Sequence, residues 1–200
     1  MLLALQKHTA GNAGKLFQLR KVKKHYVALV TGSFDPLPEN KPHVFTWSIA
    51  SCGADDFRMT IGTTDNPGRA AETKCWVLQH GTYHGNPVTK VLLEPHTGRR
   101  HQLRIHLKAA KHPIVGDATY NSKDSQLEGS TQKQSDELQK GEEIQCSIEP
   151  PRMMLHAWRL FIDLPGVPNC VESEDPFQAH SLPGLELPDQ TIAKNTLMKV

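Results

Sequence analysis

The sequence lacks the short motifs that mark the common nucleotide-dependent and serine-nucleophile enzymes. Its 200 residues hold no Gly-x-Ser-x-Gly segment, no P-loop and no dinucleotide fingerprint. No apolar run is long enough to cross a bilayer, and residues 1–5 are too short for a signal peptide. We therefore expect an intracellular protein without a membrane segment, in the cytoplasm, nucleus or mitochondrion.

Cysteine is also scarce, with four residues that are widely spaced and form no CxxC pair. This usage predicts free thiols in a reducing compartment. Three histidines, His96, His101 and His106, recur every five residues, a spacing that turns a helix by about 140° relative to the starting face. Neither a helix nor a strand would bring the three imidazoles to one ion, so we expect no metal site.

The total charge is nearly balanced, with 23 Lys and Arg against 21 Asp and Glu. The distribution along the chain is uneven. Residues 15–24 and residues 99–111 each hold five cations and no acid, whereas acids gather in 121–149 and toward the C-terminus. A surface divided by sign in this way can attract phosphate locally.

Short strand-like runs separated by Gly, Asp, Asn and Pro turns dominate the pattern. The expected strands are 25–30, 45–51, 58–61, 71–78, 88–93 and 152–162. Helical spacing is found only toward the end of residues 2–24 and after Pro95. The pattern predicts an α+β fold with a mixed or mainly antiparallel sheet flanked by helices.

We expect one domain over residues 1–165, followed by a tail rich in Pro and acids over 166–200. Within the domain, residues 121–149 contain almost no large apolar side chains. Such a segment cannot bury enough surface to order itself, so we interpret it as a flexible insertion.

The most informative segment is 97–120, TGRRHQLRIHLKAAKHPIVGDATY. Thr97 is a candidate N-cap, and Pro113 is expected to end the helix that follows. On that helix an apolar stripe (Leu103, Leu107, Ala110) would lie beside a basic one (Arg100, Arg104, Lys108, Lys111). The basic stripe fits either an anion-binding site at a helix start or an ordinary solvated face.

Two further polar residues have ordinary structural explanations. Tyr26 lies within a strand, where its ring would pack and its hydroxyl would reach the surface. Asp117 follows Gly116 in a turn, where a lone Asp usually accepts a hydrogen bond from the local backbone.

Several blocks of the sequence occur in the order found in one family of RNA-modifying enzymes. The blocks are RKVKKHYVALV (20–30), GRAAET (68–73), TGRRHQLRIH (97–106), HPIVGDATY (112–120) and LHA (155–157). Together they resemble the RluA-type pseudouridine synthases, and the resemblance extends from Met1 to about Ile162. The combination TGR-x-HQ-x-R-x-H with HP-x-x-GD-x-x-Y is its most specific part.

The resemblance implies that uridine in RNA is isomerised to pseudouridine without a cofactor or a metal, after the base is flipped out of its stack. In the family an Asp is the nucleophile and an Arg pairs with it; the matching Arg is Arg104. A Tyr lies against the target base, and here that residue is Tyr26. We expect a monomer that binds RNA. The expected RNA contacts are Lys23, Lys24, Arg99, Arg100, His101, Gln102 and Lys108.

The sequence departs from the family at the nucleophile, because the HRLD-x-x-TSG block that carries this Asp is absent. We expect the chain to begin a few residues after that block and the 200 residues alone to be inactive. A catalytically dead RNA-binding or interaction module is the alternative, and a fragment that does not fold is a third possibility.

Overall fold

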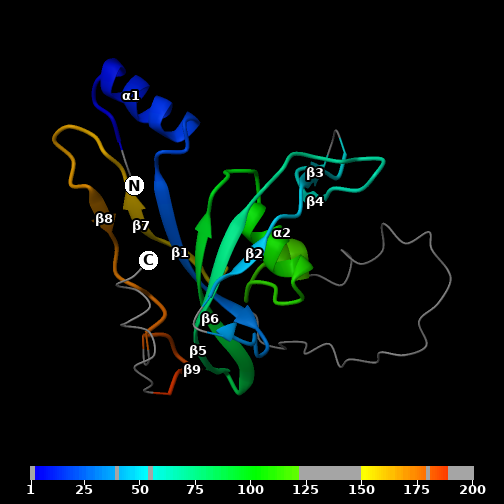
Figure 1. Ribbon diagram of the computed structural model, residues 1–200. Helices are drawn as coiled ribbons and strands as arrows, with labels where there is room; N and C mark the ends of the chain where they lie inside the picture. The colour runs from blue at the N-terminus through cyan, green and yellow to red at the C-terminus, as the bar shows by residue number, and fades with distance from the viewer. Residues whose placement is uncertain (1–2, 39–40, 54–55, 122–149, 179–180, 189–200) are drawn as a thin grey trace.

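A long antiparallel sheet forms the centre of the computed structural model, which describes residues 3–38, 41–53, 56–121, 150–178 and 181–188 (Figure 1). Its strands lie in the order β2-β5-β6-β1-β7-β8, and β9 pairs with β5. These strands are β1 (Lys23–Thr31), β2 (His43–Phe45), β5 (Thr73–Tyr83), β6 (Asn86–Pro95), β7 (Leu155–Phe161), β8 (Cys170–Glu172) and β9 (Leu185–Glu186). The expected α+β class with a mainly antiparallel sheet is confirmed.

Strands β1, β5 and β6 contribute about half of the buried residues of the main core. Strand β1 pairs with β6 on one side and with β7 on the other. Because it lies inside the sheet, its run Val27 to Val30 is completely buried. A continuous apolar run of this kind is typical of a strand covered on both faces.

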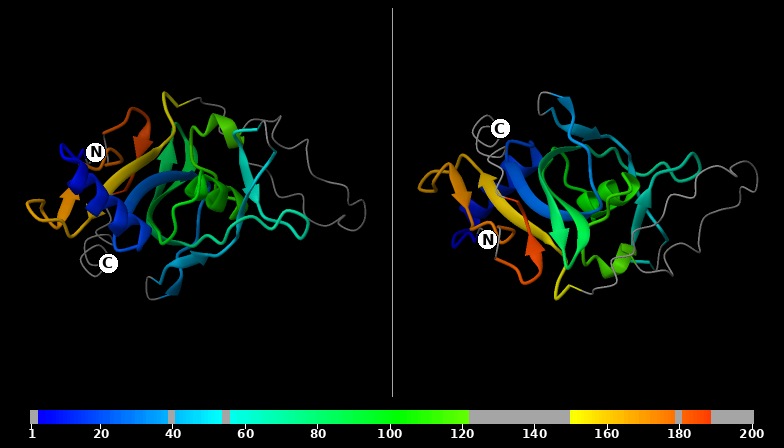
Figure 2. Two further views of the ribbon diagram at one scale, coloured as in Figure 1. Left: turned by 90° about the horizontal axis from the view of Figure 1, so that it is seen from above. Right: turned by 90° about the horizontal axis from the view of Figure 1, so that it is seen from below.

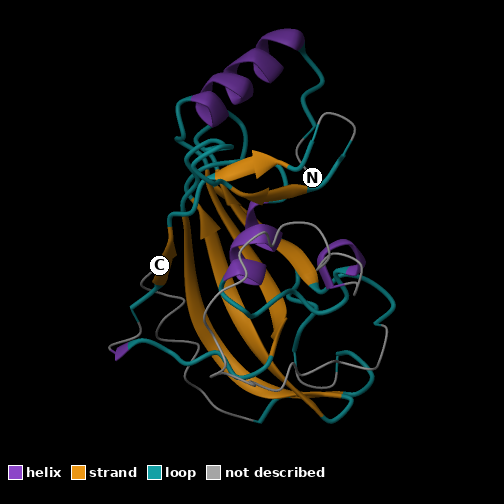
Figure 3. Cartoon of the chain, turned by 90° about the vertical axis from the view of Figure 1, so that its right-hand side faces the viewer, coloured by secondary structure: helices purple, strands orange, loops and turns teal. Residues whose placement is uncertain are grey.

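Helix α2 (Gln102–Ala109) lies across one face of the sheet (Figure 3). Its apolar residues Leu103 and Leu107 enter the main core, as the stripe predicted. Helix α1 (Lys7–Gln18) packs at the far end of the molecule through Ala13, and α3 (Ala118–Asn121) is a single turn after α2.

A separate two-stranded hairpin, β3 (Ile49–Ser51) and β4 (Met59–Ile61), packs beside α2. Views from above and below place this hairpin at the opposite end of the molecule from α1 (Figure 2). Its apolar residues form a small cluster with Ile105 and Tyr120. Gly68 makes this packing possible, because its φ is +65° and an added Cβ would lie 2.5 Å from the carbonyl of Ile49.

The expected strand 45–51 is wrong in one respect, because the chain leaves β2 after Phe45 and re-enters strand structure only at Ile49. The expected insertion 121–149 falls almost entirely on residues outside the described part. Residues of the expected tail 166–200 contribute β8, β9 and the fully buried Phe177 to the sheet and core. The proposed division at residue 165 stays a prediction.

Cys52, Cys75 and Cys170 form no disulfide among the described residues. Among the described helices, none has the length and apolar character needed to cross a membrane.

Candidate functional site

Arg104 and Asp117 form a bidentate ion pair at the centre of the segment that the sequence singles out. Arg104 donates from Nε to Asp117 Oδ2 at 2.7 Å and from Nη2 to Oδ1 at 2.6 Å. The Asp117 side chain is 2% exposed and the Arg104 side chain 15%. Parallel hydrogen bonds of this kind fix the plane of the guanidinium, so Arg104 is held in one orientation.

The turn before α3 places Asp117 opposite α2. Gly116 has φ +76°, and a Cβ there would lie 2.4 Å from the carbonyl oxygen of Arg152. Only glycine fits this approach without strain. Asp117 Oδ1 also accepts a hydrogen bond from the backbone N–H of Tyr120 at 3.3 Å. The backbone role expected for Asp117 is therefore present, and the pairing with Arg104 is an addition that sequence reasoning missed.

Tyr120 connects this pair to the hairpin β3–β4. The guanidinium carbon of Arg104 lies 4.6 Å from the centre of the Tyr120 ring, a cation–π contact. The Tyr120 hydroxyl accepts a hydrogen bond from Met59 N–H at 2.9 Å and lies 2.8 Å from His101 Nδ1. The Tyr120 side chain thus fixes the hairpin, the start of α2 and the guanidinium of Arg104 relative to one another.

Gln102 anchors the other side of the α2 start. Its amide oxygen accepts from the Thr97 hydroxyl at 2.7 Å and from Arg99 N–H at 2.9 Å. Its amide nitrogen donates to the carbonyl of Glu72 and to the Thr73 hydroxyl, both at 2.9 Å. All four hydrogen-bonding positions of the amide are filled, which favours a structural role over the RNA contact expected for Gln102.

The same network continues through α2 to the loop after β2. His106 is fully buried, with Nε2 donating to the carbonyl of Trp47 at 2.9 Å and Nδ1 3.0 Å from the Thr73 hydroxyl. Burial lowers the pKa of His106 despite the hydrogen bond to Trp47, so the ring is neutral and Nδ1 accepts. These bonds hold the chain out of strand geometry between β2 and β3.

Two expectations about the helix start are wrong. Thr97 is not its N-cap; the N-cap is His101, which has φ 54° and makes no side-chain capping bond. The Thr97 hydroxyl is instead committed to Gln102. Because α2 begins at Gln102 and ends at Ala109, Arg100 and Lys111 lie outside the helix, and the basic stripe reduces to Arg104 and Lys108.

The residues expected to contact RNA are only partly brought together. Arg100 is exposed beside the α2 start, and Arg99 donates from Nε to the carbonyl of Ala70 at 3.0 Å. Lys24 reaches the loop of Gly98 and Arg99, because its Nζ lies 3.8 Å from where a Cβ on Gly98 would be. Lys23 is set apart, because it pairs with Glu94 at 3.2 Å.

Tyr26 lies on β1, opposite Leu93 on one side and Ala157 on the other. Its side chain is partly buried, and burial raises the pKa of its phenol. No hydrogen bond joins Tyr26 to Arg104 among the described residues. The place of Tyr26 against a target base and the pairing of Arg104 with a nucleophilic Asp therefore stay predictions.

The electrostatics keep Arg104 charged and His101 neutral. Hydrogen bonding to Asp117 raises the pKa of Arg104, whereas burial, aided by the charges of Arg104 and Arg100, lowers the pKa of His101. Burial also lowers the pKa of Lys108. Asp117 accepts from two of the five N–H groups of Arg104, and no hydrogen bond within the described part of the chain uses the other three, which are available to a second anion.

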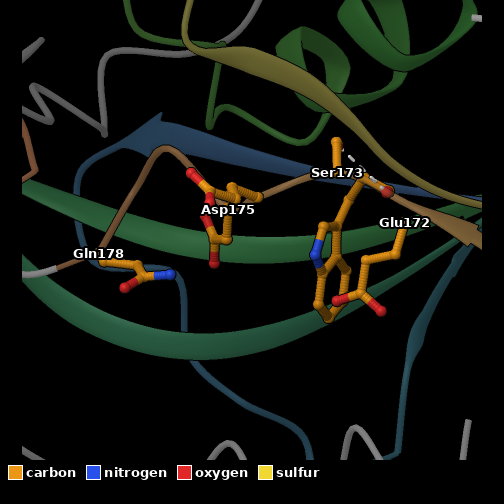
Figure 4. A pocket seen from close by; sticks show the side chains of 6 residues that line it. Glu172, Ser173, Asp175 and Gln178 are labelled. Carbon is orange, nitrogen blue, oxygen red and sulfur yellow. Dashed lines mark hydrogen bonds between the residues drawn. The ribbon is translucent and has the colours of Figure 1, made fainter.

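Two other features of the described residues bear on the site. No group of three or more His, Cys, Asp or Glu side chains in the described ranges is arranged to hold a metal ion. A pocket on the β7–β8 side is lined by Trp158, Glu172, Ser173, Glu174, Asp175 and Gln178 (Figure 4). Its carboxylates Glu172 and Asp175 pair with Arg159 and Lys90. This acidic lining does not suit an RNA phosphate.

Comparison with known proteins agrees with the motifs. The family model described as RNA pseudouridylate synthase matches residues 1–109. The zebrafish (Danio rerio) RNA pseudouridylate synthase domain-containing protein 1 is 39% identical over 180 residues, which cover 88% of this chain and 53% of that protein. The Haemophilus influenzae dual-specificity RNA pseudouridine synthase RluA is 32% identical over 167 residues, covering 82% and 62%.

A solved structure of human RNA pseudouridylate synthase domain containing 1 matches with a TM-score of 0.75 and 31% identity, covering 98% of this chain and 72% of that one. The chain spans about half the length of the curated animal relatives that it matches. The family model covers more than half of the 200 residues. The chain therefore belongs to the RNA pseudouridylate synthase family.

Proposed function

We propose that the whole protein isomerises uridine to pseudouridine in RNA, and that this chain supplies the RNA-facing surface around Arg104. One observation carries the proposal: Arg104, in the TGR-x-HQ-x-R-x-H block, forms a bidentate pair with the buried Asp117, and no hydrogen bond among the described residues uses its other N–H donors. The exposed Arg100 and the half-buried Lys24 and Lys108 lie beside the same helix start or along it. Cations arranged in this way support binding of a phosphate backbone.

The reaction breaks the C1′–N1 bond of uridine, turns the uracil and forms a C1′–C5 bond. The proton on C5 is released, and N1 gains one. In this proposal Arg104 uses its remaining N–H donors to hold a nucleophilic carboxylate ionised and oriented. Tyr26 would present its ring to the flipped base.

Asp117 is a poor candidate for the nucleophile. Its side chain is 2% exposed, and both carboxylate oxygens are held by Arg104. A nucleophile must approach C1′ of the ribose, and a buried carboxylate with this pairing cannot. We assign Asp117 the role of positioning Arg104.

An RNA-binding module without catalysis is the second candidate. It is favoured by one feature of the sequence, because the HRLD-x-x-TSG block does not occur in the 200 residues. The widely spaced cysteines, which form no CxxC pair, support an intracellular compartment. The monomeric state stays a prediction.

Release of tritium from RNA labelled at C5 of uridine separates the two candidates, because only isomerisation removes the C5 hydrogen. Two proteins are compared: the 200-residue chain, and a fusion that places an HRLD-containing segment of an RluA-type relative before Met1. We expect RNA binding by both and tritium release by the fusion alone. Release by the chain itself would show that the nucleophile lies within it. RNA binding without release by either protein would favour the module.

A further inference from the structure

The connection between β3 and β4 presents an aromatic ring to solvent beside the cations of the α2 start. Phe57 is 57% exposed, although phenylalanine is usually buried. Its ring lies edge-on to the ring of His101, with centroids 6.4 Å apart and planes at 84°. Phe57 therefore stands at the margin of the surface that carries Arg100.

The charge around this ring is positive on balance. Asp56 pairs with Arg58 at 2.6 Å, and the charge of Arg100 acts on the same carboxylate. Lys108 lies close enough to Arg58 and Asp117 for both charges to act on its pKa. This part of the molecule therefore holds four cations, Arg58, Arg100, Arg104 and Lys108, and two carboxylates, Asp56 and Asp117. The positive balance attracts a polyanion.

The hairpin that carries Phe57 is fixed to the site. Met59, two residues after Phe57, donates its N–H to the Tyr120 hydroxyl, and Tyr120 also contacts His101 and Arg104. Ile49 of β3 packs in the cluster with Tyr120. An exposed ring on an anchored hairpin loses little conformational freedom when something stacks on it.

We propose that Phe57 is a stacking site for an unpaired base of single-stranded RNA, next to the phosphates held by Arg100. The inference rests on the proposed function and adds a contact that lies outside the blocks resembling the family. Aromatic faces take bases of any identity, whereas neighbouring cations track the backbone. Phe57 therefore contributes affinity that depends little on salt, and Arg100 contributes affinity that depends on it.

The test measures anisotropy of a fluorescein-labelled, uridine-containing single-stranded RNA with the 200-residue chain. Three Phe57 variants are compared: Phe57→Ala, Phe57→Leu, which keeps apolar bulk without a π face, and Phe57→Trp. Phe17→Ala is the matched control, because Phe17 is 44% exposed on α1 at the other end of the molecule. A second RNA in which abasic sugars replace the bases keeps the phosphates and removes the stacking partners.

For intact RNA we expect Phe57→Ala and Phe57→Leu to weaken binding about tenfold, while Phe57→Trp and Phe17→Ala bind like the unchanged chain. The slope of log affinity against log salt should not change in these variants. On abasic RNA all five proteins should bind alike. Equal affinity of Phe57→Ala and Phe17→Ala for intact RNA would overturn the stacking site and leave the proposed function standing. An unchanged chain that binds no RNA would overturn both.

Discussion

Replacing Arg104 by alanine should destabilise the protein strongly, because it leaves the Asp117 carboxylate buried without its partner. Removing one member of a buried ion pair costs about 3–5 kcal/mol. Loss of the contact with the Tyr120 ring adds about 0.5–1 kcal/mol. We therefore expect the free energy of unfolding to fall by about 4 kcal/mol, a large share of the total for a domain of this size.

Urea unfolding followed by tryptophan fluorescence measures this change, since Trp76 and Trp158 are both buried. The double variant with Asp117→Ala closes a mutant cycle. Removing both partners also removes the uncompensated charge, so the double variant should be at least about 2 kcal/mol more stable than the sum of the single effects implies. Additive effects, or a cost below about 1 kcal/mol for Arg104→Ala, would show that the protein tolerates Asp117 without its partner.

Three smaller changes test other parts of the account. Tyr120→Phe keeps the ring and loses the hydroxyl, so the free energy of unfolding should fall by about 1–2 kcal/mol and the Met59 amide should exchange faster with solvent; unchanged exchange at that amide would contradict the anchoring role. Burial alone would raise the pKa of Glu94, but hydrogen bonds and charges from His25 and Lys23 outweigh burial and lower this pKa to about 2. The stabilisation from the Glu94 carboxylate is therefore complete above its usual pKa near 4.5 and is lost as pH falls toward 2. In urea melts at several pH values, Glu94→Gln should reduce the loss of unfolding free energy between these pH values by about 2 kcal/mol. The same loss in both proteins would argue against the pairing. Gly68→Ala puts a Cβ against the Ile49 carbonyl at positive φ and should cost about 2 kcal/mol or more in thermal unfolding, whereas a neutral result would show that the hairpin can shift.

The sequence predicted the elements whose pattern is local. Strands β1, β5 and β6 follow from runs of apolar and β-branched residues, and α2 follows from the spacing of Leu103 and Leu107. The α+β class follows from their order along the chain. In each case the residues that define the element are neighbours in sequence.

The errors arise where a distant partner decides the geometry. The Thr97 hydroxyl caps no helix, because Gln102 offers it a buried acceptor. The strand expected through residues 45–51 is interrupted because His106, far along the chain, binds the carbonyl of Trp47. Neither partner can be found from local propensity, which tertiary contacts routinely override.

The pairing of Asp117 with Arg104 was missed for a related reason. Asp117 lies in a turn after glycine, a context that usually satisfies local backbone, and it does so here. The available signal was chemical, because an arginine on a helix that also buries apolar residues needs a carboxylate near it. Asp117 is the one carboxylate in the sequence of residues 97–120.

The most direct test of the central claim separates catalysis from binding at Arg104. Single-turnover tritium release and the RNA Kd are measured for the HRLD-bearing fusion and for its Arg104→Lys variant, with Phe17→Ala as the control. Lysine keeps the charge but cannot form the bidentate pair that fixes the guanidinium. We expect the rate to fall by about 100-fold with little change in Kd, since small misplacement of a catalytic group has this effect. A lysine variant that releases tritium at the unchanged rate would contradict the role given to Arg104.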